Sequence, residues 1–238
     1  MPNQRERLAV PPADLLLRLP DIGRLMITAK QGGATHERIG SVARAERRGD
    51  AVVLSGDEHA STIALGGIAS VIVDRTSVMR DQAYPRADFL DAEDDVLFSV
   101  VGFGGIEPFD AVLARFGPGE ALPVRTDESG PRGEVIEGDP GAAPFEAALK
   151  LAAPVTIGFA RPGFEQAWHG LVEGVKPAMG FINVMRPDFH LHLKSGAVAH
   201  WRAEPAGDEV VLHAERADGA PIGLFVRGPA ILAADAAS

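Results

Sequence analysis

The spacing of glycines repeats between the two halves of the chain, and this repeat constrains the fold more than any other feature. A shift of 130 positions, without gaps, places residues 25–74 on residues 155–204 and aligns the glycines at 33, 40 and 66 with those at 163, 170 and 196. Glycines at fixed offsets mark backbone positions that need a positive φ angle or a close approach. Only six of the 50 aligned pairs are identical, so the shared spacing is the stronger signal. We therefore expect a duplication with two structurally similar halves.

Short apolar runs, punctuated by Gly, Asp and Pro, follow one another along most of the chain and predict strands. The predicted strands are 25–29, 51–54, 61–65, 71–74, 96–101, 155–159, 180–185, 189–194, 198–203, 210–215 and 223–227. Their close spacing favours antiparallel pairing, because a parallel crossover needs a dozen or more residues. Short helices are predicted over 11–19, 108–116 and 144–151. The predicted class is α+β: mainly antiparallel β-sheet, in two structurally repeated halves with a few short helices.

Residues 117–143 differ in composition from the chain on either side. They hold six glycines and four prolines among 27 residues, with charges between them and little periodic apolar pattern. Such a composition is typical of a linker or a long surface loop. The predicted organisation is a first repeat over 1–116, a Gly/Pro-rich linker over 117–143 and a second repeat over 144–238.

The composition narrows the classes of function. The chain has 238 residues and no cysteine, which excludes a disulfide scaffold, a thiolate metal site and a cysteine nucleophile. Its formal net charge of −10 argues against nucleic acid as a partner, because non-specific binding needs Lys and Arg to neutralise phosphates. Neither a targeting segment nor an apolar run long enough to cross a membrane is visible, so we expect a cytoplasmic protein without a membrane partner.

Common catalytic motifs are missing from the sequence. It contains no G-x-S-x-G, no H-E-x-x-H, no Walker A motif and no EF-hand loop. The glycines within 102–105 lack the third glycine of a dinucleotide-binding fingerprint and indicate a tight turn. The motifs therefore leave open whether the protein is an enzyme.

Histidines concentrate in the second half of the chain. Of the seven, five lie beyond residue 160, and the densest cluster is the segment 188–201, DFHLHLKSGAVAHW. In an extended strand, His190 and His192 lie on one face, and the apolar residues at 189, 191 and 193 lie on the other. If Ser195 and Gly196 form a two-residue hairpin loop, Trp201 lies opposite His190. Two imidazoles and an indole would then share one face.

Three interpretations of this histidine pair stay open. The H-x-H spacing resembles the chelate of a cupin-like metal site, although Gly and Ala stand at 196 and 197, where that pattern needs a glutamate. The imidazoles can equally be structural groups on a half-exposed sheet face. A flat ligand such as haem needs one axial histidine, an apolar slot and Arg or Lys near its propionates. Beside the two histidines, the segment holds Lys194 and Trp201, and Arg202 follows it directly.

Residues 163–201 resemble the second half of bacterial haemin-utilisation and haemin-degrading proteins of the HemS/ChuX type. The resemblance rests on a Gly-x-x-Gln stretch, an Asn-Val pair and a Pro-Asp-Phe-x-Leu-His-Leu run. The matching residues are Gly163, Gln166, Gly170, Val172, Asn183, Val184, Pro187, Asp188, Phe189, Leu191, His192 and Leu193. In the first half, residues 34–42 are similar to the family's Val-His-Glu-x-x-Gly segment through His36, Glu37 and Gly40. The resemblance implies a duplicated, mainly antiparallel fold that handles haem in the cytoplasm.

The chain departs from the family pattern at the expected ligand. Full two-repeat members carry an axial histidine between the repeats, whereas this chain has no histidine between His59 and His169. Where the family has a histidine in a Gln-x-His-x-Gly stretch, this chain has Trp168, with His169 one place later. A shift of one place on a strand turns a side chain to the other face. His192 is therefore the best-matched ligand.

The resemblance extends the candidate haem contacts beyond the histidine pair. His36 is either such a contact or a histidine in a surface turn. Trp201 either stacks on the ligand or packs in the core. Arg75, one of the arginines around Tyr84-Pro85, either meets a propionate or is a surface arginine near a turn. The predicted haem-binding residues are His192, His190, His36, His169, Trp201, Arg202 and Arg75, with His192 and His190 as the metal ligands.

We therefore expect a haem-binding protein of haem and iron utilisation that acts as a carrier or in sequestration. One alternative is a HemS/ChuX-like fold without a haem ligand that serves as an interaction or small-molecule-binding module. Another is an enzyme that degrades haem with an external electron donor, a chemistry that belongs to the haem itself. Besides haem, a second copy of the chain is an expected partner, because exposed sheet edges can pair.

Overall fold

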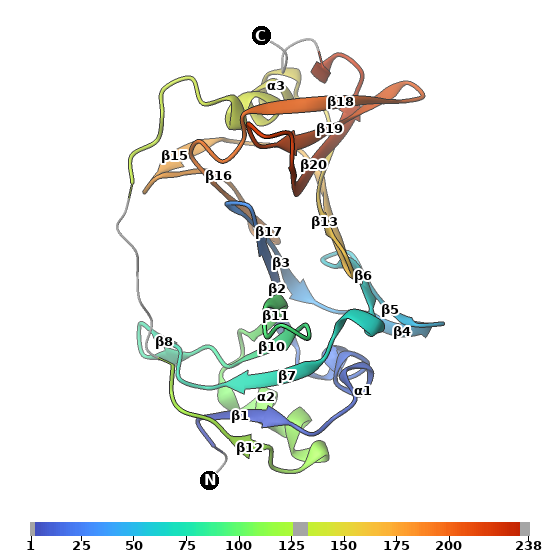
Figure 1. Cartoon of the computed structure of the whole chain (residues 1–238), viewed down its shortest axis with the longest axis vertical. Coiled ribbons are helices and arrows are strands. Elements are labelled where there is room, and N and C mark those ends of the chain that lie inside the picture. The colour runs from blue at the N-terminus through green and yellow to red at the C-terminus, as the bar shows by residue number, and fades with distance from the viewer. Residues whose placement is uncertain (1–2, 126–132, 234–238) are drawn as a thin grey trace. The chain divides into compact units, whose positions relative to one another are not determined.

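The computed structural model describes residues 3–125 and 133–233, and these residues divide into two compact units. The first unit comprises 3–29, 38–125 and 162–165, and the second comprises 30–37, 133–161 and 166–233. Strands dominate both units, which confirms the predicted class of mainly antiparallel sheet with short helices (Figure 1). None of the helices formed by the described residues combines the length and the apolar content that crossing a bilayer requires.

The first unit contains a sheet in the strand order β12-β1-β7-β10-β11-β2 and a smaller group in the order β6-β5-β4. The sheet strands are β1 (Arg5–Leu8), β2 (Arg24–Gln31, of which 24–29 belong here), β7 (Ser70–Asp74), β10 (Arg86–Leu90), β11 (Val96–Gly102) and β12 (Glu120–Ala121). The smaller group is β4 (Arg44–Arg48), β5 (Ala51–Ser55) and β6 (Ala60–Ala64). The other elements are α1 (Pro12–Leu16), η1 (Leu19–Asp21), η2 (Leu65–Gly67), β8 (Val78–Met79), β9 (Gln82–Ala83), α2 (Ile106–Leu113) and η3 (Ala114–Phe116).

The second unit contains strands in the order β18-β19-β20-β13-β14 and a group in the order β3-β17-β16-β15. The first set is β13 (Val155–Arg161), β14 (Phe164–Gly170, of which 166–170 belong here), β18 (His200–Ala206), β19 (Glu209–Glu215) and β20 (Pro221–Pro229). The second set is β3 (Ala34–Ser41, of which 34–37 belong here), β15 (Lys176–Ala178), β16 (Phe181–Arg186) and β17 (Phe189–Lys194). The helical elements are η4 (Pro140–Ala142) and α3 (Ala143–Leu151).

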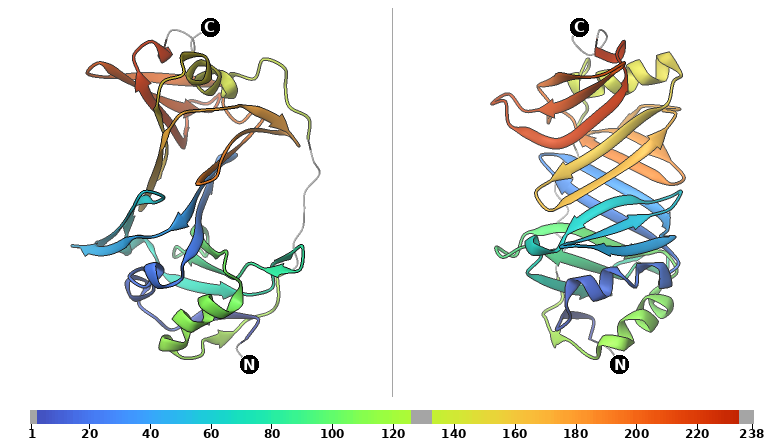
Figure 2. Two further views of the ribbon diagram at one scale, coloured as in Figure 1. Left: turned by 180° about the vertical axis from the view of Figure 1, so that it is seen from behind. Right: turned by 90° about the vertical axis from the view of Figure 1, so that its right-hand side faces the viewer.

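Helix α3 lies next to the β18–β19–β20 strands in both views of Figure 2. The ring of Phe145 on α3 meets that of Trp201 on β18 edge-on, with the ring centres 5.8 Å apart. The indole nitrogen of Trp201 donates a hydrogen bond to the carbonyl of Pro140 at 3.0 Å. Trp201 therefore packs in the core of the second unit, as one of the two interpretations of this residue predicted.

The strand orders confirm the predicted repeat. A shift of 130 positions takes β5 (Ala51–Ser55) onto 181–185, within β16, and takes β6 (Ala60–Ala64) onto 190–194, within β17. The order β7-β10-β11-β2 of the first unit recurs as β18-β19-β20-β13 in the second, and β6-β5-β4 recurs as β17-β16-β15. The two halves therefore share one architecture, whereas the boundaries proposed at 116 and 144 stay a prediction.

The predicted hairpin across Ser195-Gly196 is wrong. The turn itself forms, because the amide of Ala197 donates to the carbonyl of Lys194 at 3.0 Å. However, β17 pairs with β16, and β18 pairs with β19 in a different sheet. His190 therefore lies opposite Met185 rather than Trp201, and the indole does not share a face with the histidine pair. The strands at 34–41, 86–90 and 164–170 were also not predicted from the sequence.

Candidate functional site

Strand β17 presents its two histidines on the face opposite its apolar residues, as its alternating pattern predicts. The apolar residues at 189, 191 and 193 are fully buried, whereas His190 and His192 are partly exposed. In the antiparallel register with β16, His190 lies opposite Met185 and His192 lies opposite Asn183. The imidazole centres lie 6.0 Å apart. The buried face therefore fixes β17 on the core and leaves both imidazoles accessible.

A carboxylate from β3 completes this face. Glu37 Oε2 lies 3.4 Å from Nδ1 of His190 and 3.8 Å from Nε2 of His192. Strand β3 neighbours β17, and the amide of Lys194 donates to the carbonyl of Gly33 at 2.8 Å. The side chain of Glu37 is only 14% exposed, whereas those of His190 and His192 are 28% and 32% exposed. The carboxylate thus lies deeper than the imidazoles and next to both.

The surroundings of Glu37 keep its carboxylate ionised. Burial alone raises the pKa of Glu37, but His190 and His192, which in their protonated forms donate hydrogen bonds to the carboxylate and carry positive charge, lower that pKa to about 2. Opposing effects of this kind mark a carboxylate that is held between specific partners rather than one that is simply exposed. Near neutral pH, the site therefore holds a fixed negative charge beside two titratable imidazoles.

Asn183 fixes the orientation of the His192 ring. Its amide nitrogen donates to the carbonyls of Lys176 at 2.9 Å and Phe181 at 3.0 Å, which determines which way the amide points. Its Oδ1 therefore faces Nδ1 of His192, at 2.6 Å. Because a carbonyl oxygen only accepts, Nδ1 of His192 carries the proton. In the neutral ring, Nε2 then offers its lone pair on the side of Glu37.

A groove of about 470 Å³ opens beside these residues in the second unit. Two exposed methionines, Met179 and Met185, contribute apolar surface to it. Met179 has a φ of 55° in the two-residue turn between β15 and β16, a conformation that non-glycine residues rarely adopt. The lining residues are Lys30, Thr35, Glu37, Lys176, Ala178, Met179, Phe181, Asn183, Met185 and His192. The groove is thus apolar along its methionines and phenylalanine, and its lining also holds two lysines, one glutamate and one imidazole.

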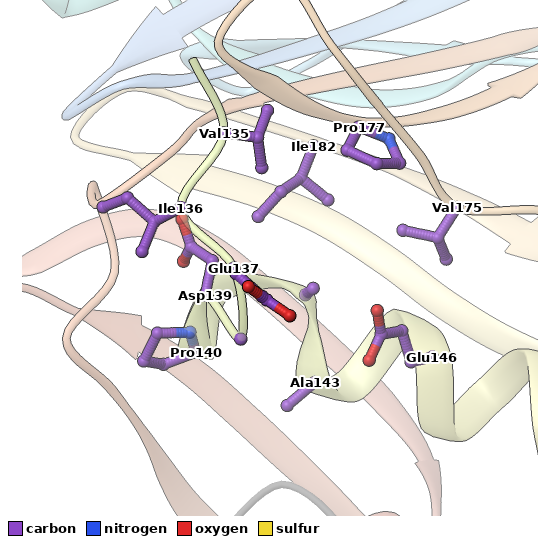
Figure 3. Close-up of a pocket in the computed structure, with 12 residues that line it drawn as sticks. Val135, Ile136, Glu137, Asp139, Pro140, Ala143, Glu146, Val175, Pro177 and Ile182 are labelled. Carbon is purple, nitrogen blue, oxygen red and sulfur yellow. The ribbon is translucent and has the colours of Figure 1, made fainter.

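Another hollow of the second unit, of about 410 Å³, lies between the loop that precedes α3 and strands β15 and β16 (Figure 3). Val135, Val175 and Ile182 give it apolar walls, and its charged lining residues, Glu137, Asp139 and Glu146, are all acidic. Asp139 is already engaged, because it accepts hydrogen bonds from Ser195 Oγ at 2.5 Å and the Gly196 amide at 2.7 Å. This hollow is therefore poorly suited to a ligand with carboxylate groups.

His36 is fully buried in β3, so the surface-turn alternative is wrong. Its Nε2 donates to the carbonyl of Ile157 at 3.1 Å, and its Nδ1 accepts from the Gln166 amide at 2.9 Å. The Gln166 amide also donates to the His36 carbonyl, at 2.9 Å. Both ring nitrogens are thus used within the core, and His36 does not line the groove.

The remaining predicted contacts lie away from the groove lining. His169 is exposed on β14, where its Nδ1 lies 3.1 Å from Thr156 Oγ1. Arg202 on β18 pairs with Glu215 at 2.8 Å. Arg75 belongs to the first unit and is buried, with hydrogen-bonded partners described below. Of the residues predicted from the sequence, the structure therefore brings His190 and His192 together and leaves the others elsewhere.

The role of Glu37 was not predicted from the sequence, although the residue belongs to the segment that resembles the haemin proteins. The sequence separates Glu37 from His190 by more than 150 positions, so no local spacing connects them. The same holds for Lys30, which reaches the groove from the end of β2. The only local signal was the His-Glu pair at 36 and 37, in which the glutamate, rather than the histidine, contributes to the site.

Comparison with known proteins identifies the fold. No protein-family model matches the sequence, and no curated protein matches it either. The crystal structure of ChuS, an Escherichia coli haem oxygenase, superimposes with a TM-score of 0.75 at 20% identity over 94% of this chain and 83% of ChuS. Holo-PhuS, a haem-binding protein from Pseudomonas aeruginosa, superimposes with a TM-score of 0.76 at 19% identity over 94% of this chain and 81% of PhuS. The chain therefore has the fold of ChuS and PhuS, and its resemblance to proteins of the HemS/ChuX type is confirmed at the level of the fold.

Proposed function

We propose that this protein binds haem in the groove of its second unit and acts as a carrier or sequestration protein in cytoplasmic haem utilisation. The observation that carries the proposal is an oriented, partly exposed imidazole, His192, in the lining of a largely apolar groove that also holds two lysines. The fold, shared with a haem-binding protein and a haem oxygenase, agrees with it. The proposal keeps His192 as the iron ligand, with His190 beside it on the same strand, and leaves out the other predicted contacts.

His192 has the chemistry of an axial ligand. Its Nδ1 proton is engaged by Asn183, so the lone pair of Nε2 stays available for iron. Metal-binding histidines usually donate their second ring nitrogen in this way, which fixes the tautomer and makes the ligand more basic. The ionised Glu37 beside the same ring adds negative charge. Negative charge near the iron favours the ferric state, the form in which free haemin is carried.

The groove also suits the other parts of a haem. The porphyrin is flat and apolar, and the side chains of Met179, Phe181 and Met185 provide apolar surface for it. Methionine adapts to the shape of a ligand because it is unbranched and polarizable. The exposed side chains of Lys30 and Lys176 would meet the two propionates, whose charge is opposite to theirs. Iron itself supplies ligand exchange and redox chemistry once bound.

A haemin titration of the purified chain, followed at the Soret band, tests the proposal. We expect a shift that saturates near one haem per chain, and His192→Ala to abolish it. His200→Ala is the matched control, because His200 is an exposed histidine that pairs with Glu215 away from the groove lining. Unsaturable absorbance with the wild-type protein would mean that the fold is retained without haem binding, as in the interaction-module alternative.

Adding ascorbate to the haem-loaded protein separates a carrier from a haem-degrading enzyme. The Soret band of a haem-loaded carrier persists, and its only change is the shift that reduction of the iron causes. An enzyme that degrades haem loses the band in the presence of oxygen, because the porphyrin ring is opened. Persistence of the band over many minutes supports the carrier, and its loss supports degradation.

A further inference from the structure

Three donor groups in the second unit converge on one point. One ligand atom each from Glu37, His190 and His192 lies within 4.8 Å of the others. The distances from Glu37 Oε2 to the nearest imidazole nitrogens are 3.4 Å and 3.8 Å. Metal–ligand bonds of about 2.1 Å at tetrahedral angles place neighbouring ligand atoms about 3.4 Å apart. The three groups are therefore spaced as the ligands of a single ion, with only small side-chain movements needed.

We propose that Glu37, His190 and His192 bind a divalent transition-metal ion, of the class of Zn²⁺ or Fe²⁺, when haem does not occupy the groove. This inference goes beyond haem binding, and it adds Glu37 as the third ligand to the two histidines. Two imidazoles and one carboxylate suit zinc and ferrous iron, whereas calcium and magnesium prefer oxygen ligands throughout. Three protein ligands leave coordination positions open for water or a small molecule.

The neighbouring residues prepare the site for an ion. The Asn183 side chain holds His192 with its proton on Nδ1, so Nε2 is free of a proton in the neutral ring. The side chain of Glu37 is only 14% exposed, and it brings a carboxylate, a ligand for divalent transition-metal ions, beside both imidazoles. The two imidazoles are partly exposed, which gives an ion in solution a path to the site. Metal sites typically combine ligands with outer partners in this way.

Glu37 distinguishes an ion from haem. The porphyrin nitrogens occupy four positions around haem iron, so that iron can accept only axial ligands from the protein. A bare ion can accept all three groups at once. Removing the Glu37 carboxylate should therefore lower the affinity for the ion strongly and the affinity for haem only slightly. The competing explanation is that Glu37 merely forms ion pairs with protonated histidines, and it predicts no saturable uptake of an ion.

Titration of the full-length, haem-free chain with Co²⁺ and with Zn²⁺ tests the site. Visible absorption reports the coordination of Co²⁺, and calorimetry gives the affinity and stoichiometry for Zn²⁺. We expect the wild-type chain to bind one ion. Removing an outer partner of a metal ligand typically costs roughly 10–100-fold in affinity, and we expect Glu37→Gln and His190→Ala, which each remove a ligand, to cost more than that. The control is Glu215→Gln, which alters the pair of Glu215 with His200, away from the three ligands, and should leave the affinity unchanged.

The wild-type titration also decides the question if a variant fails to fold, because it needs no substitution. Wild-type protein that takes up no stoichiometric ion, or a folded Glu37→Gln variant that binds as tightly as wild type, overturns the proposal. Haemin titrations of the same samples keep the two ideas apart. A chain that binds Zn²⁺ but not haemin refutes only the haem proposal, and a Glu37→Gln variant that keeps its Soret band while losing Zn²⁺ supports both.

Discussion

His59 should make the stability of the first unit depend on pH. The residue precedes β6 and is fully buried, with Nε2 donating to the carbonyl of Gly40 at 3.2 Å. No described residue offers a partner to its Nδ1. Burial, helped by the positive charge of Arg38, lowers the pKa of His59 to about 4, although the hydrogen bond to Gly40 and the negative charge of Glu58 raise it. The ring is therefore neutral in the folded protein near pH 7.

The magnitude follows from the difference between the folded and unfolded pKa values. In the unfolded chain, His59 regains its ordinary pKa of 6.5, so below that pH the unfolded state binds more protons than the folded one. Stability is unaffected above pH 6.5, falls as the pH drops through the window from 6.5 to 4, and levels off below it. The free energy of unfolding should fall by about 2 kcal/mol at pH 5 and by about 3 kcal/mol well below pH 4.

Urea unfolding at about pH 7.5 and about pH 5 measures this loss. Two variants without a titratable group at this position are the controls. His59→Gln keeps a donor for the Gly40 carbonyl. His59→Phe has a precedent in the chain, because the fully buried Phe189 stands at the equivalent position of the second half. Glu37 does not contribute in this window, because its pKa falls from 4.5 to about 2 and its stabilisation is lost only as the pH drops through that lower range. If wild type and variants lose the same free energy between the two pH values, the assignment to His59 is refuted.

Three further predictions concern the groove and the first unit. Asn183→Ala should weaken Zn²⁺ binding by roughly 10–100-fold in calorimetry and broaden the haem titration, because His192 loses the acceptor that orients it. Met179→Gly should raise the free energy of unfolding by up to about 1 kcal/mol, and with it the thermal midpoint, because glycine tolerates the φ of 55°. The same substitution should lower the affinity for haem, because it removes apolar surface from the groove. Arg75→Ala should cost about 3–5 kcal/mol in urea unfolding, because buried Arg75 pairs with Glu6 at 2.9 Å and with Asp110 at 2.7 Å. Its haemin titration should match that of wild type, and a weakened one would restore Arg75 as a propionate contact.

Local patterns explain which parts of the fold were predictable. Strand β17 was predicted with its observed bounds, because the alternation of apolar and polar residues at 189–194 has the period of two that a half-buried strand requires. The 130-residue repeat was visible because glycine spacing survives when side chains change. Both signals lie within short windows or at a constant offset. Both patterns can therefore be recognised in the sequence without knowing which segments are in tertiary contact.

The missed features depend on pairing between distant segments. The turn at Ser195-Gly196 is real, but a turn signal does not determine which strands pair across it, and β17 instead pairs with β16. His36 is buried because Gln166, at the equivalent position of the other repeat, hydrogen-bonds to its ring. Glu37 reaches the histidines only because β3 lies beside β17. Such neighbours follow from the tertiary fold, so a single sequence without its fold could not reveal the third ligand.

The repeat also explains why the proposed donor groups are not duplicated. Equivalent buried positions keep their character, because Val52 and Leu54 of the first half correspond to Ile182 and Val184 of the second, and all four are buried. The positions of the proposed metal ligands do not keep the same type of residue in the other half. His190, His192 and Glu37 correspond to Ala60, Thr62 and Ala167. Because successive residues of a strand face opposite ways, one face can preserve the core while the other changes freely. Among the described residues, the three donor groups of the proposed ion site therefore occur once, in the second unit, although the architecture around them is duplicated.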